Sequence, residues 1–277
     1  MTTTLLEEHA LLGAQMAPDD ACPAVLGYGD PEGEVTALRG SCGLCDLSGA
    51  ALTLVAGPGA SRFGDVAIAS APLMVGECAP GAVLAGDGAL TGIPLAMRTG
   101  DGEVLLFDAS PRSDTVFWWV GWLASMEQGG VRPFDDASVE DHTGDLVPLA
   151  LIGPGAPEVL GDYLGAGQPL PEPGGVSSPI LDQIRGVICA HVPTSGSPAF
   201  LLLVPPRLAR ALWRSFLSFE QVTPVGGEAL GAWAVDALPW SREVAAGGRI
   251  EVAAQLLVGL DVARPEGGFV GARALGI

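Results

Sequence analysis

Apolar and polar positions follow two different periods along this chain, which predicts a mixture of helices and strands. Apolar residues at helical spacing predict amphipathic helices over four segments, residues 5–16, 34–42, 113–127 and 206–219. Short apolar runs bounded by turn residues predict strands over five segments, residues 82–85, 93–98, 104–108, 186–192 and 200–204. A segment rich in proline and glycine, residues 169–179, is expected to be a connector.

One pattern occurs twice. The turns Gly57-Pro-Gly-Ala60 and Gly153-Pro-Gly-Ala156 each follow a buried-type strand and precede a helical segment whose first turn tolerates proline. The helical segments span residues 61–68 and 157–164. This repeat predicts two related halves. The order of strands and helices favours α+β layers built from ferredoxin-like units over a doubly wound parallel sheet.

Composition excludes several classes of function. The 277 residues are 48% hydrophobic and 16% charged, and the net charge is −19, which disfavours nucleic acids and anionic membranes as partners. All 13 basic residues are arginines, so a P-loop lysine and a Schiff-base lysine are excluded. The apolar runs are too short for a membrane span, and the acidic start does not resemble a signal peptide. We therefore expect a cytoplasmic protein.

Cysteine and histidine residues give no strong site. Cys42 and Cys45 form an isolated CxxC pair, and the other cysteines, Cys22, Cys78 and Cys189, add no second pair, which favours structural roles. The run Glu140-Asp141-His142 imitates a metal cluster, but neighbouring strand residues point to opposite faces and cannot all bind one ion. We expect no metal site.

Aromatic residues gather on one predicted helix, at Trp118, Trp119 and Trp122. Such a stripe could stack on a pterin ring, but packing into a core is the commoner use and is the one expected here. Neither a nucleophile elbow nor a dinucleotide-binding fingerprint is present. The residue patterns by themselves therefore indicate no catalytic residue.

Several blocks in collinear order resemble the glycine-cleavage T-proteins, the aminomethyltransferases. They are Leu5-x3-His9-x2-Leu-Gly-Ala-x-Met16, Glu34-x2-Ala37-x-Arg39-x3-Gly43-Leu44-x-Asp46-Leu-Ser48, the two Gly-Pro-Gly-Ala turns, Thr223-Pro-Val-Gly226 and Phe269-Val-Gly271-Ala-Arg-Ala-Leu275. The resemblance implies an α+β fold of two interleaved ferredoxin-like domains around a folate channel. It also implies a C-terminal β-barrel, and this chain ends where that barrel would begin. Within the region 1–277, the expected subdomains are 1–48 plus 138–225 and 49–137 plus 226–277.

The functional residues of that family are largely replaced here. In the family's Gly-Gly-x-x-Asp-Asp-Leu segment the second aspartate lies near the reactive folate nitrogen, whereas this chain has Gly92. The family's pterin-holding tyrosine and glutamate correspond to Thr194 and Leu201. The segment 229–237 has neither of the family's two arginines and keeps only Asp236 as an acidic group. The related iron–sulfur assembly factors carry Lys-Gly-Cys-x-x-Gly-Gln-Glu, which segment 266–273 also lacks.

These replacements lead to two hypotheses. In the first, the chain is an aminomethyltransferase-like protein of one-carbon metabolism that does not catalyse standard aminomethyl transfer. It is then a ligand-binding, scaffolding or regulatory subunit of a larger complex, with tetrahydrofolate as the candidate ligand. In the alternative, it is an active tetrahydrofolate-dependent methyl- or aminomethyltransferase with altered chemistry. The polar groups expected to contact the folate are Asp236, Thr194 and Arg98, with Arg264 for its glutamate tail. A protein partner or a second copy is expected at the face where the barrel would dock.

Overall fold

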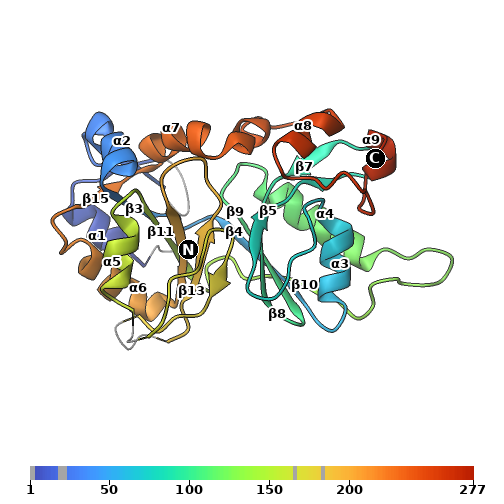
Figure 1. Ribbon diagram of the computed structural model, residues 1–277, viewed down its shortest axis with the longest axis horizontal. Coiled ribbons are helices and arrows are strands. Elements are labelled where there is room, and N and C mark those ends of the chain that lie inside the picture. The colour runs from blue at the N-terminus through green and yellow to red at the C-terminus, as the bar shows by residue number, and fades with distance from the viewer. Residues whose placement is uncertain (1–3, 18–23, 165–166, 182–184) are drawn as a thin grey trace. The chain divides into compact units, whose positions relative to one another are not determined.

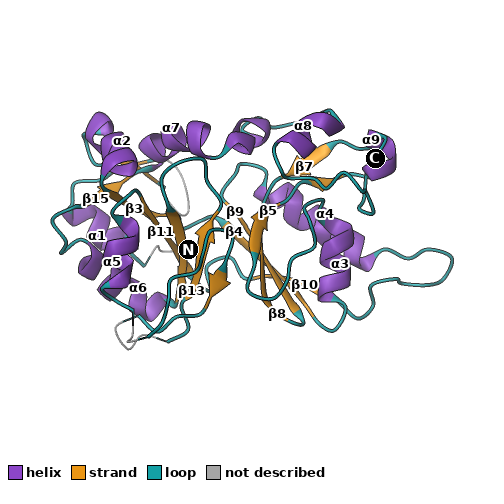
Figure 2. Cartoon of the chain, in the orientation of Figure 1, coloured by secondary structure: helices purple, strands orange, loops and turns teal. Residues whose placement is uncertain are grey.

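The computed structural model describes residues 4–17, 24–164, 167–181 and 185–277. The chain folds into two compact units, and each is built from two separate stretches of sequence. The first unit combines the segment up to Gly49 with Gly144–Pro239, and the second combines Ala50–Thr143 with Trp240–Ile277. Figure 1 follows the chain from the N-terminus in blue to the C-terminus in red, and Figure 2 marks its helices and strands.

The first unit is organised around one mixed sheet. In the described residues its strand order is β12-β13-β14-β11-β3-β15, and every pair is antiparallel except β15 with β3. Strand β11 crosses through α5 to β13, and β14 crosses through α6 to β15, which is a ferredoxin-like order with β3 inserted. The strands are β3 (Cys42–Asp46), β11 (Val147–Ile152), β12 (Val176–Ser177), β13 (Ile188–Val192), β14 (Ala199–Val204) and β15 (Val222–Val225), beside a separate pair, β1 (Gln15–Met16) and β2 (Val25–Gly27).

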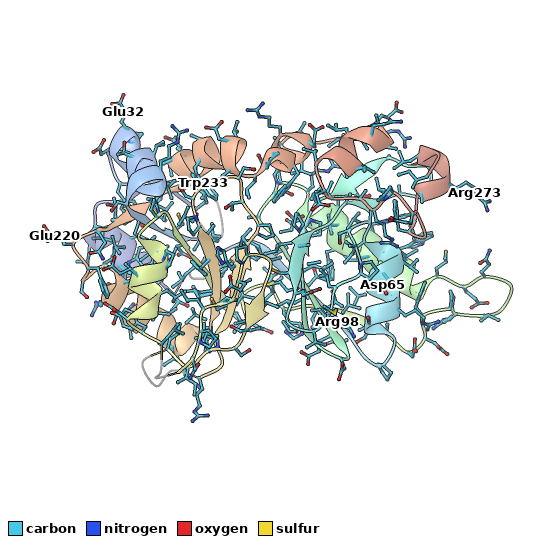
Figure 3. All side chains as sticks on the ribbon, viewed as in Figure 1. Glu32, Asp65, Arg98, Glu220, Trp233 and Arg273 are labelled. Carbon is cyan, nitrogen blue, oxygen red and sulfur yellow. The ribbon has the colours of Figure 1, made fainter. Side chains whose placement is uncertain are left out.

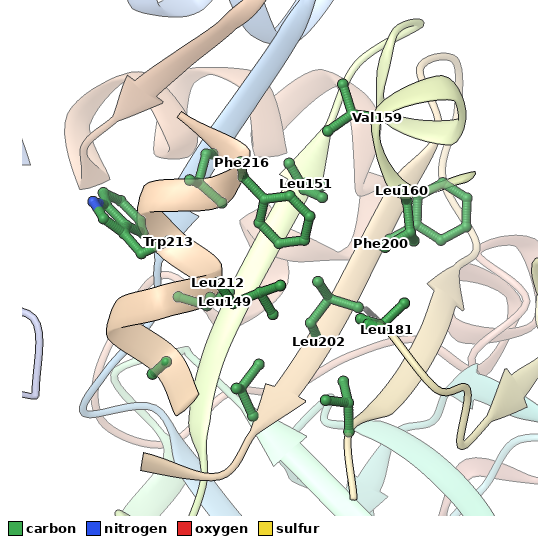
Figure 4. Close-up of a cluster of buried hydrophobic side chains, with 14 of the residues drawn as sticks. Leu149, Leu151, Val159, Leu160, Leu181, Phe200, Leu202, Leu212, Trp213 and Phe216 are labelled. Atoms are coloured by element: carbon green, nitrogen blue, oxygen red, sulfur yellow. The ribbon is translucent and has the colours of Figure 1, made fainter. Parts of the chain in front are cut away.

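Helices cover this sheet and bury its apolar side chains. Trp213 and Phe216 of α6 are fully buried in the same apolar cluster as Leu149 of β11 and Leu202 of β14 (Figure 4). Burying a large side chain of this kind stabilises a fold by about 1.5–3 kcal/mol. The helices of the unit are α1 (Leu6–Leu11), α2 (Pro31–Gly40), α5 (Ala156–Gly161), α6 (Pro206–Phe216) and α7 (Gly227–Ala237).

The second unit has a regular ferredoxin-like sheet. Its strand order is β10-β4-β9-β8-β5 in the described residues, and all pairs are antiparallel. Strand β4 crosses through α3 to β8, β8 turns into β9, and β9 crosses through α4 to β10 at the edge. The strands are β4 (Ala51–Ala56), β5 (Cys78–Pro80), β8 (Leu95–Gly100), β9 (Glu103–Asp108) and β10 (Ser138–Asp141), beside the pair β6 (Val83–Leu84) and β7 (Leu90–Gly92).

Two apolar clusters hold the second unit together. Phe63 of α3 and Val120 of α4 pack on Val104 and Leu106 of β9. The C-terminal segment forms a second cluster in which Leu257, Val262 and Phe269 surround Leu84 and Leu90. The helices are α3 (Ala60–Ala67), α4 (Ser113–Ser125), a 3-10 helix η1 (Pro239–Val244), α8 (Ala254–Gly259) and α9 (Ala272–Leu275). No C-terminal β-barrel is found in the part of the chain that the structure describes.

The two Gly-Pro-Gly-Ala turns occupy equivalent positions in the two units. Gly57 follows β4 with φ +113°, and Gly153 follows β11 with φ +127°. A Cβ atom at either position would approach a backbone carbonyl, that of Asp136 or that of Ser41. The amides of Gly59 and Gly155 donate to these same carbonyls, at 3.0 Å and 2.9 Å. Both the left-handed backbone and the close approach require glycine, so the sequence repeat reflects a structural repeat.

Two helices differ from what the sequence predicts. The first helix covers only Leu6–Leu11, because the chain turns at Gly13 with φ +74° and continues as β1. Helix α4 packs through Val116, Val120 and Leu123, while Trp118 is 73% exposed, so the expectation that the tryptophan stripe packs into the core is wrong for Trp118. Trp122 is also more than half exposed, whereas Val116, Val120 and Leu123 are the side chains of α4 that are buried.

The contacts group helix α7 with a different unit from the one that the sequence assigns it to. The sequence assigns residues 226–277 to the second subdomain, whereas contacts group Gly227–Ala237 with the first unit. The reason is apolar packing, since Ala229 and Trp233 of α7 are buried against Leu38 of α2 and Val225 of β15. The other unit boundaries lie at Gly49/Ala50 and Thr143/Gly144, where the sequence places them after residues 48 and 137.

Candidate functional site

The second unit contains a small cavity between α3 and the β8–β9 hairpin. Its volume is about 20 Å³, enough for one or two water-sized groups, and it is partly open to solvent. Its lining combines apolar residues with a guanidinium group, a carboxylate and two hydroxyl-bearing residues. The lining residues are Ser61, Gly64, Asp65, Ile68, Ser70, Ala71, Leu73, Ala96, Arg98 and Val104.

Arg98 brings the positive charge to this cavity. It lies near the end of β8, where its backbone amide and carbonyl pair with Glu77 and Gly76. Nη1 donates to the carbonyl oxygen of Leu73 at 2.8 Å, which fixes one end of the guanidinium plane. Nε is buried and has no acceptor among the described residues. One sequence-predicted ligand group therefore has unused hydrogen-bonding capacity in a cavity.

Asp65 brings a negative charge to the same wall, from α3. Figure 3 labels both Asp65 on its helix and Arg98 on its strand. Burial raises the pKa of the Asp65 carboxyl group, and the positive charges of Arg264 and Arg98 oppose that shift. In the described part of the chain no ion pair joins Asp65 to Arg98. The two charges line one cavity without neutralising each other by direct contact.

Arg264, the residue predicted for a glutamate tail, is used inside the fold. Its three guanidinium nitrogens donate to five backbone carbonyl oxygens, those of Asp65, Ile68, Ser70, Gly267 and Gly268, at 2.6–3.1 Å. A guanidinium group has five N–H donors, so these contacts occupy all of them. Burial also lowers its pKa. The structure thus gives Arg264 the role of tying the C-terminal segment to the end of α3.

The other two predicted ligand residues lie in the first unit. Thr194 follows β13, and its hydroxyl group donates to the carbonyl oxygen of Ser197 at 2.8 Å. Asp236 lies on α7 and forms an ion pair of 2.7 Å with Arg39, and its side chain is 63% exposed. The amide of Ser195 donates to the carbonyl of Ala237, so Thr194 and Asp236 belong to adjoining segments. Two of the four predicted residues therefore lie in each unit.

The environment of Gly92 shows what replaces the expected aspartate. A Cβ atom at this position, the last residue of β7, would collide with Cγ2 of Val116 on α4. Oδ2 of Asp108, at the end of β9, would lie 3.6 Å from that Cβ. The position is therefore closed to an acidic side chain, while a carboxylate from the neighbouring strand comes close to it.

Asp108 is a buried acid with one unused oxygen. Its Oδ1 accepts from the amide of Ser110 at 2.8 Å, whereas the buried Oδ2 has no partner among the described residues. Burial raises its pKa, against the opposing effects of the Ser110 hydrogen bonds and the Arg112 charge. Arg112 is buried beside it and donates to four backbone carbonyls, including those of Thr91 and Leu90. Sequence reasoning missed Asp108, whose one sequence signal is the Asp-Ala-Ser turn after a strand.

A second polar network, also missed by sequence reasoning, is buried in the first unit. His9 of α1 is 1% exposed, and its Nε2 lies 2.8 Å from Oδ2 of Asp46. Its Nδ1 lies 2.9 Å from the hydroxyl group of Tyr28. The other Asp46 oxygen accepts from the amide and the hydroxyl group of Ser48. Every member has a partner, which is typical of a network that fixes packing.

The remaining sequence candidates are placed as follows. Cys42 and Cys45 of β3 lie in separate apolar clusters on opposite faces of the sheet, so they cannot act together as a dithiol pair. His142 lies near the exposed Glu140, at 3.5 Å. Within the described ranges, no three His, Cys, Asp or Glu side chains gather into a metal-binding group. Cys22 lies outside the described residues.

Comparison with known proteins shows which protein family the chain belongs to. The family model described as the GCVT N-terminal domain matches residues 6–239, so the chain belongs to that family. A curated relative, the aminomethyltransferase of Corynebacterium jeikeium (strain K411), is 24% identical over 253 residues. The match covers 85% of this chain and 62% of the relative. The chain thus spans less than two thirds of the length of that enzyme.

Solved structures agree on the fold. The glycine cleavage system aminomethyltransferase T from Bartonella henselae superposes with a TM-score of 0.74 at 22% identity, over 99% of this chain and 73% of that chain. The α+β fold expected from the resemblance is therefore confirmed. A heterotetrameric sarcosine oxidase from Corynebacterium sp. U-96 gives a TM-score of 0.44 at 16% identity, over 69% of this chain and 91% of that chain, too low to support a conclusion. In the described ranges no helix is both long and apolar enough to cross a membrane.

Proposed function

We propose that this chain is an aminomethyltransferase-like protein of one-carbon metabolism that does not catalyse standard aminomethyl transfer. The supporting observation is the closed position at Gly92. The resemblance requires a carboxylate there, and glycine can neither hold a proton nor stabilise a developing positive charge. Because Val116 fills the space that a side chain would need, the loss is built into the packing of α4 on β7. No catalytic residue is assigned to standard transfer.

Tetrahydrofolate is the ligand class that the family implies, and the residues present fit it only in part. Leu201, at the position of the family's pterin-holding glutamate, is buried in the middle of β14 and offers no acceptor. Thr194 and Asp236 keep polar groups on adjoining segments of the first unit, and in the second unit the buried Nε of Arg98 has no acceptor among the described residues. We propose Thr194 and Asp236, and separately Arg98 in its own unit, as candidate folate contacts, whereas the donors of Arg264 are already occupied. Without a charged acceptor for the pterin, binding should be weakened by a few kcal/mol.

Location and partners extend this proposal. The net charge of −19 disfavours nucleic acids and anionic membranes, which supports a cytoplasmic protein. The partner or second copy expected at the barrel-docking face stays a prediction. Size-exclusion chromatography with light scattering tests the second copy. A monomeric mass at all accessible concentrations would contradict self-association.

Calorimetric titration tests the folate part. Tetrahydrofolate and its 5-methyl and 5-formyl forms are titrated into the purified protein, with the Thr194→Ala variant in parallel. We expect binding weaker than about 1 μM, about −8 kcal/mol, and further weakening in the variant. Absence of heat and of a thermal shift at millimolar folate would contradict folate binding. Submicromolar binding unchanged in the variant would contradict the assigned contacts.

One observation favours the alternative of an active transferase with altered chemistry. The unpartnered Oδ2 of Asp108 lies 3.6 Å from the position that a Gly92 Cβ would take. A carboxylate supplied from β9 could therefore serve where the aspartate of β7 is missing. The test is Asp108→Asn, which keeps the shape and removes the acid. Transfer activity in the natural protein that the variant loses would support this alternative, and absence of activity in both would exclude it.

A further inference from the structure

The cavity on the second unit has the features of a ligand site of its own, beyond the folate contact proposed for Arg98. The guanidinium edge formed by Nε and Nη2 is the edge that binds a carboxylate through two parallel hydrogen bonds. In Arg98 the opposite side is held by the Leu73 carbonyl, so this edge is oriented, and its Nε is buried without an acceptor. A buried donor of this kind costs free energy until it is paired. The first requirement of the site is therefore a carboxylate.

The opposite charge in the same lining adds a second requirement. Asp65 faces the cavity from α3, and the described residues include no ion pair between it and Arg98. The charge of Arg264 acts on Asp65, but all five of its donors are held by backbone carbonyls, so none is left for an ion pair with that carboxylate. A bound group that carries an ammonium beside its carboxylate would pair with both Arg98 and Asp65. A simple anion would leave Asp65 without an ion-pair partner and would be repelled by it.

Size and surroundings narrow the ligand further. The volume of about 20 Å³ admits only a few heavy atoms beneath the surface, and the partly open mouth leaves room for a short side chain. Ser61 and Ser70 add hydroxyl-bearing residues to the wall, and Leu73, Ala96 and Val104 add an apolar floor. We propose that this cavity binds a small α-amino acid, with Arg98 on its carboxylate and Asp65 on its ammonium group.

The test is calorimetric titration of the full chain with glycine and alanine, and with acetate and methylammonium as half-ligands. We expect one site per chain for the amino acids, and affinities at least about tenfold lower for each half-ligand. Arg98→Gln and Asp65→Asn should each weaken amino-acid binding by about tenfold or more. Arg132→Gln and Asp114→Asn, which change exposed residues elsewhere in the unit, are the matched controls and should bind as the natural protein does.

Each outcome decides the proposal. No heat at about 10 mM amino acid, where a millimolar site would be nearly saturated, would mean that the cavity holds only water and would overturn it. Acetate binding as tightly as glycine would overturn the role of Asp65. Asp65→Asn provides a second variant if Arg98→Gln lowers the melting temperature. Amino-acid binding without folate binding would uphold this site and contradict the folate proposal, and the reverse result would do the opposite.

Discussion

The two units share a ferredoxin-like order but treat their buried charges differently. In the first unit, buried His9 is paired with Asp46 and Tyr28, and buried Glu34 accepts from two backbone amides. In the second unit the buried Arg112 is paired with backbone carbonyls, but Arg98 Nε and Asp108 Oδ2 are buried without partners in the described residues. Paired charges hold a fold, whereas unpaired ones indicate either a ligand or a tolerated cost. This difference directs the search for chemistry to the second unit.

Removing Glu34 should produce the largest effect. Its carboxylate accepts from the amides of Tyr28 and Gly226, at 2.6 Å and 2.8 Å, and the residue is 2% exposed. Glu34→Ala leaves two buried donors unpaired, and we expect the free energy of unfolding to fall by about 3 kcal/mol. Urea unfolding measures this change. Glu32→Ala, at an exposed position in the first turn of the same helix, is the control; equal losses in both variants would break the comparison.

The substitution Gly92→Ala should cause the next largest loss of stability. The added methyl group collides with Val116, and overpacking of this kind costs about 1–3 kcal/mol. Gly86→Ala, at a position with nothing within 4 Å, should change the melting temperature little. The double variant Gly92→Ala/Val116→Ala should recover part of the loss. A stable Gly92→Ala protein would contradict the statement that Val116 closes this position.

The pH dependence of folding stability at Asp108 tests the same comparison of the two units, with a smaller expected effect. Burial raises the pKa of the Asp108 carboxyl group in the folded protein. The stabilisation that Asp108 provides is therefore complete below the unfolded-state pKa of about 3.9, and it is lost as the pH rises through the folded-state pKa. We therefore expect the stability of the natural protein relative to Asp108→Asn to fall as the pH rises from about 4 to 7. Urea midpoints across this range measure the difference.

Asp141 is the matched control, since it accepts from the amide two residues later, as Asp108 does. Hydrogen bonds from Thr143 lower the pKa of this exposed acid, so its contribution is present above the unfolded pKa and is lost as the pH falls. Asp141→Asn should show a small dependence of opposite sign. The same sign in both variants would refute the assignment of a raised pKa to Asp108.

The smallest effect is expected for the thiols. Burial raises the pKa of Cys42 and of Cys78 to about 12, and it raises that of Cys45 as well. Cys189 is also buried. A Cys22→Ser protein should therefore react with a disulfide reagent only after unfolding, because the thiolate is the reactive form. A rapid reaction of one thiol in the native state would contradict the burial of these cysteines.

The sequence predicted the fold better than the site, for physical reasons. Period and turn chemistry are local, so the helix at 206–219 and the two Gly-Pro-Gly-Ala turns appear near their expected positions. Whether Trp118 or Val116 faces the core depends on how α4 packs on the rest of the unit, which no local pattern encodes. The closure of Gly92 likewise depends on a side chain 24 positions away.

The candidate ligand residues show the same limit. Arg98 was predicted and lines a cavity, but its companion Asp65 was missed because only the packing of α3 against β8 and β9 brings the two together. Arg264 was predicted to contact the glutamate tail of a folate, yet its donors are occupied by carbonyls of the neighbouring Gly267 and Gly268 and of the distant segment 65–70. An arginine's availability depends on such tertiary contacts, which a single sequence does not reveal.

The most direct measurement is an assay of aminomethyl and methyl transfer to tetrahydrofolate by the purified natural protein, followed by mass spectrometry of the folate. We expect no transfer above the uncatalysed rate, because Gly92 and the packing of Val116 leave no acid at the position that the family uses. Transfer that persists in the purified protein and disappears in Asp108→Asn would contradict this account and would identify a transferase whose acid has moved to the neighbouring strand.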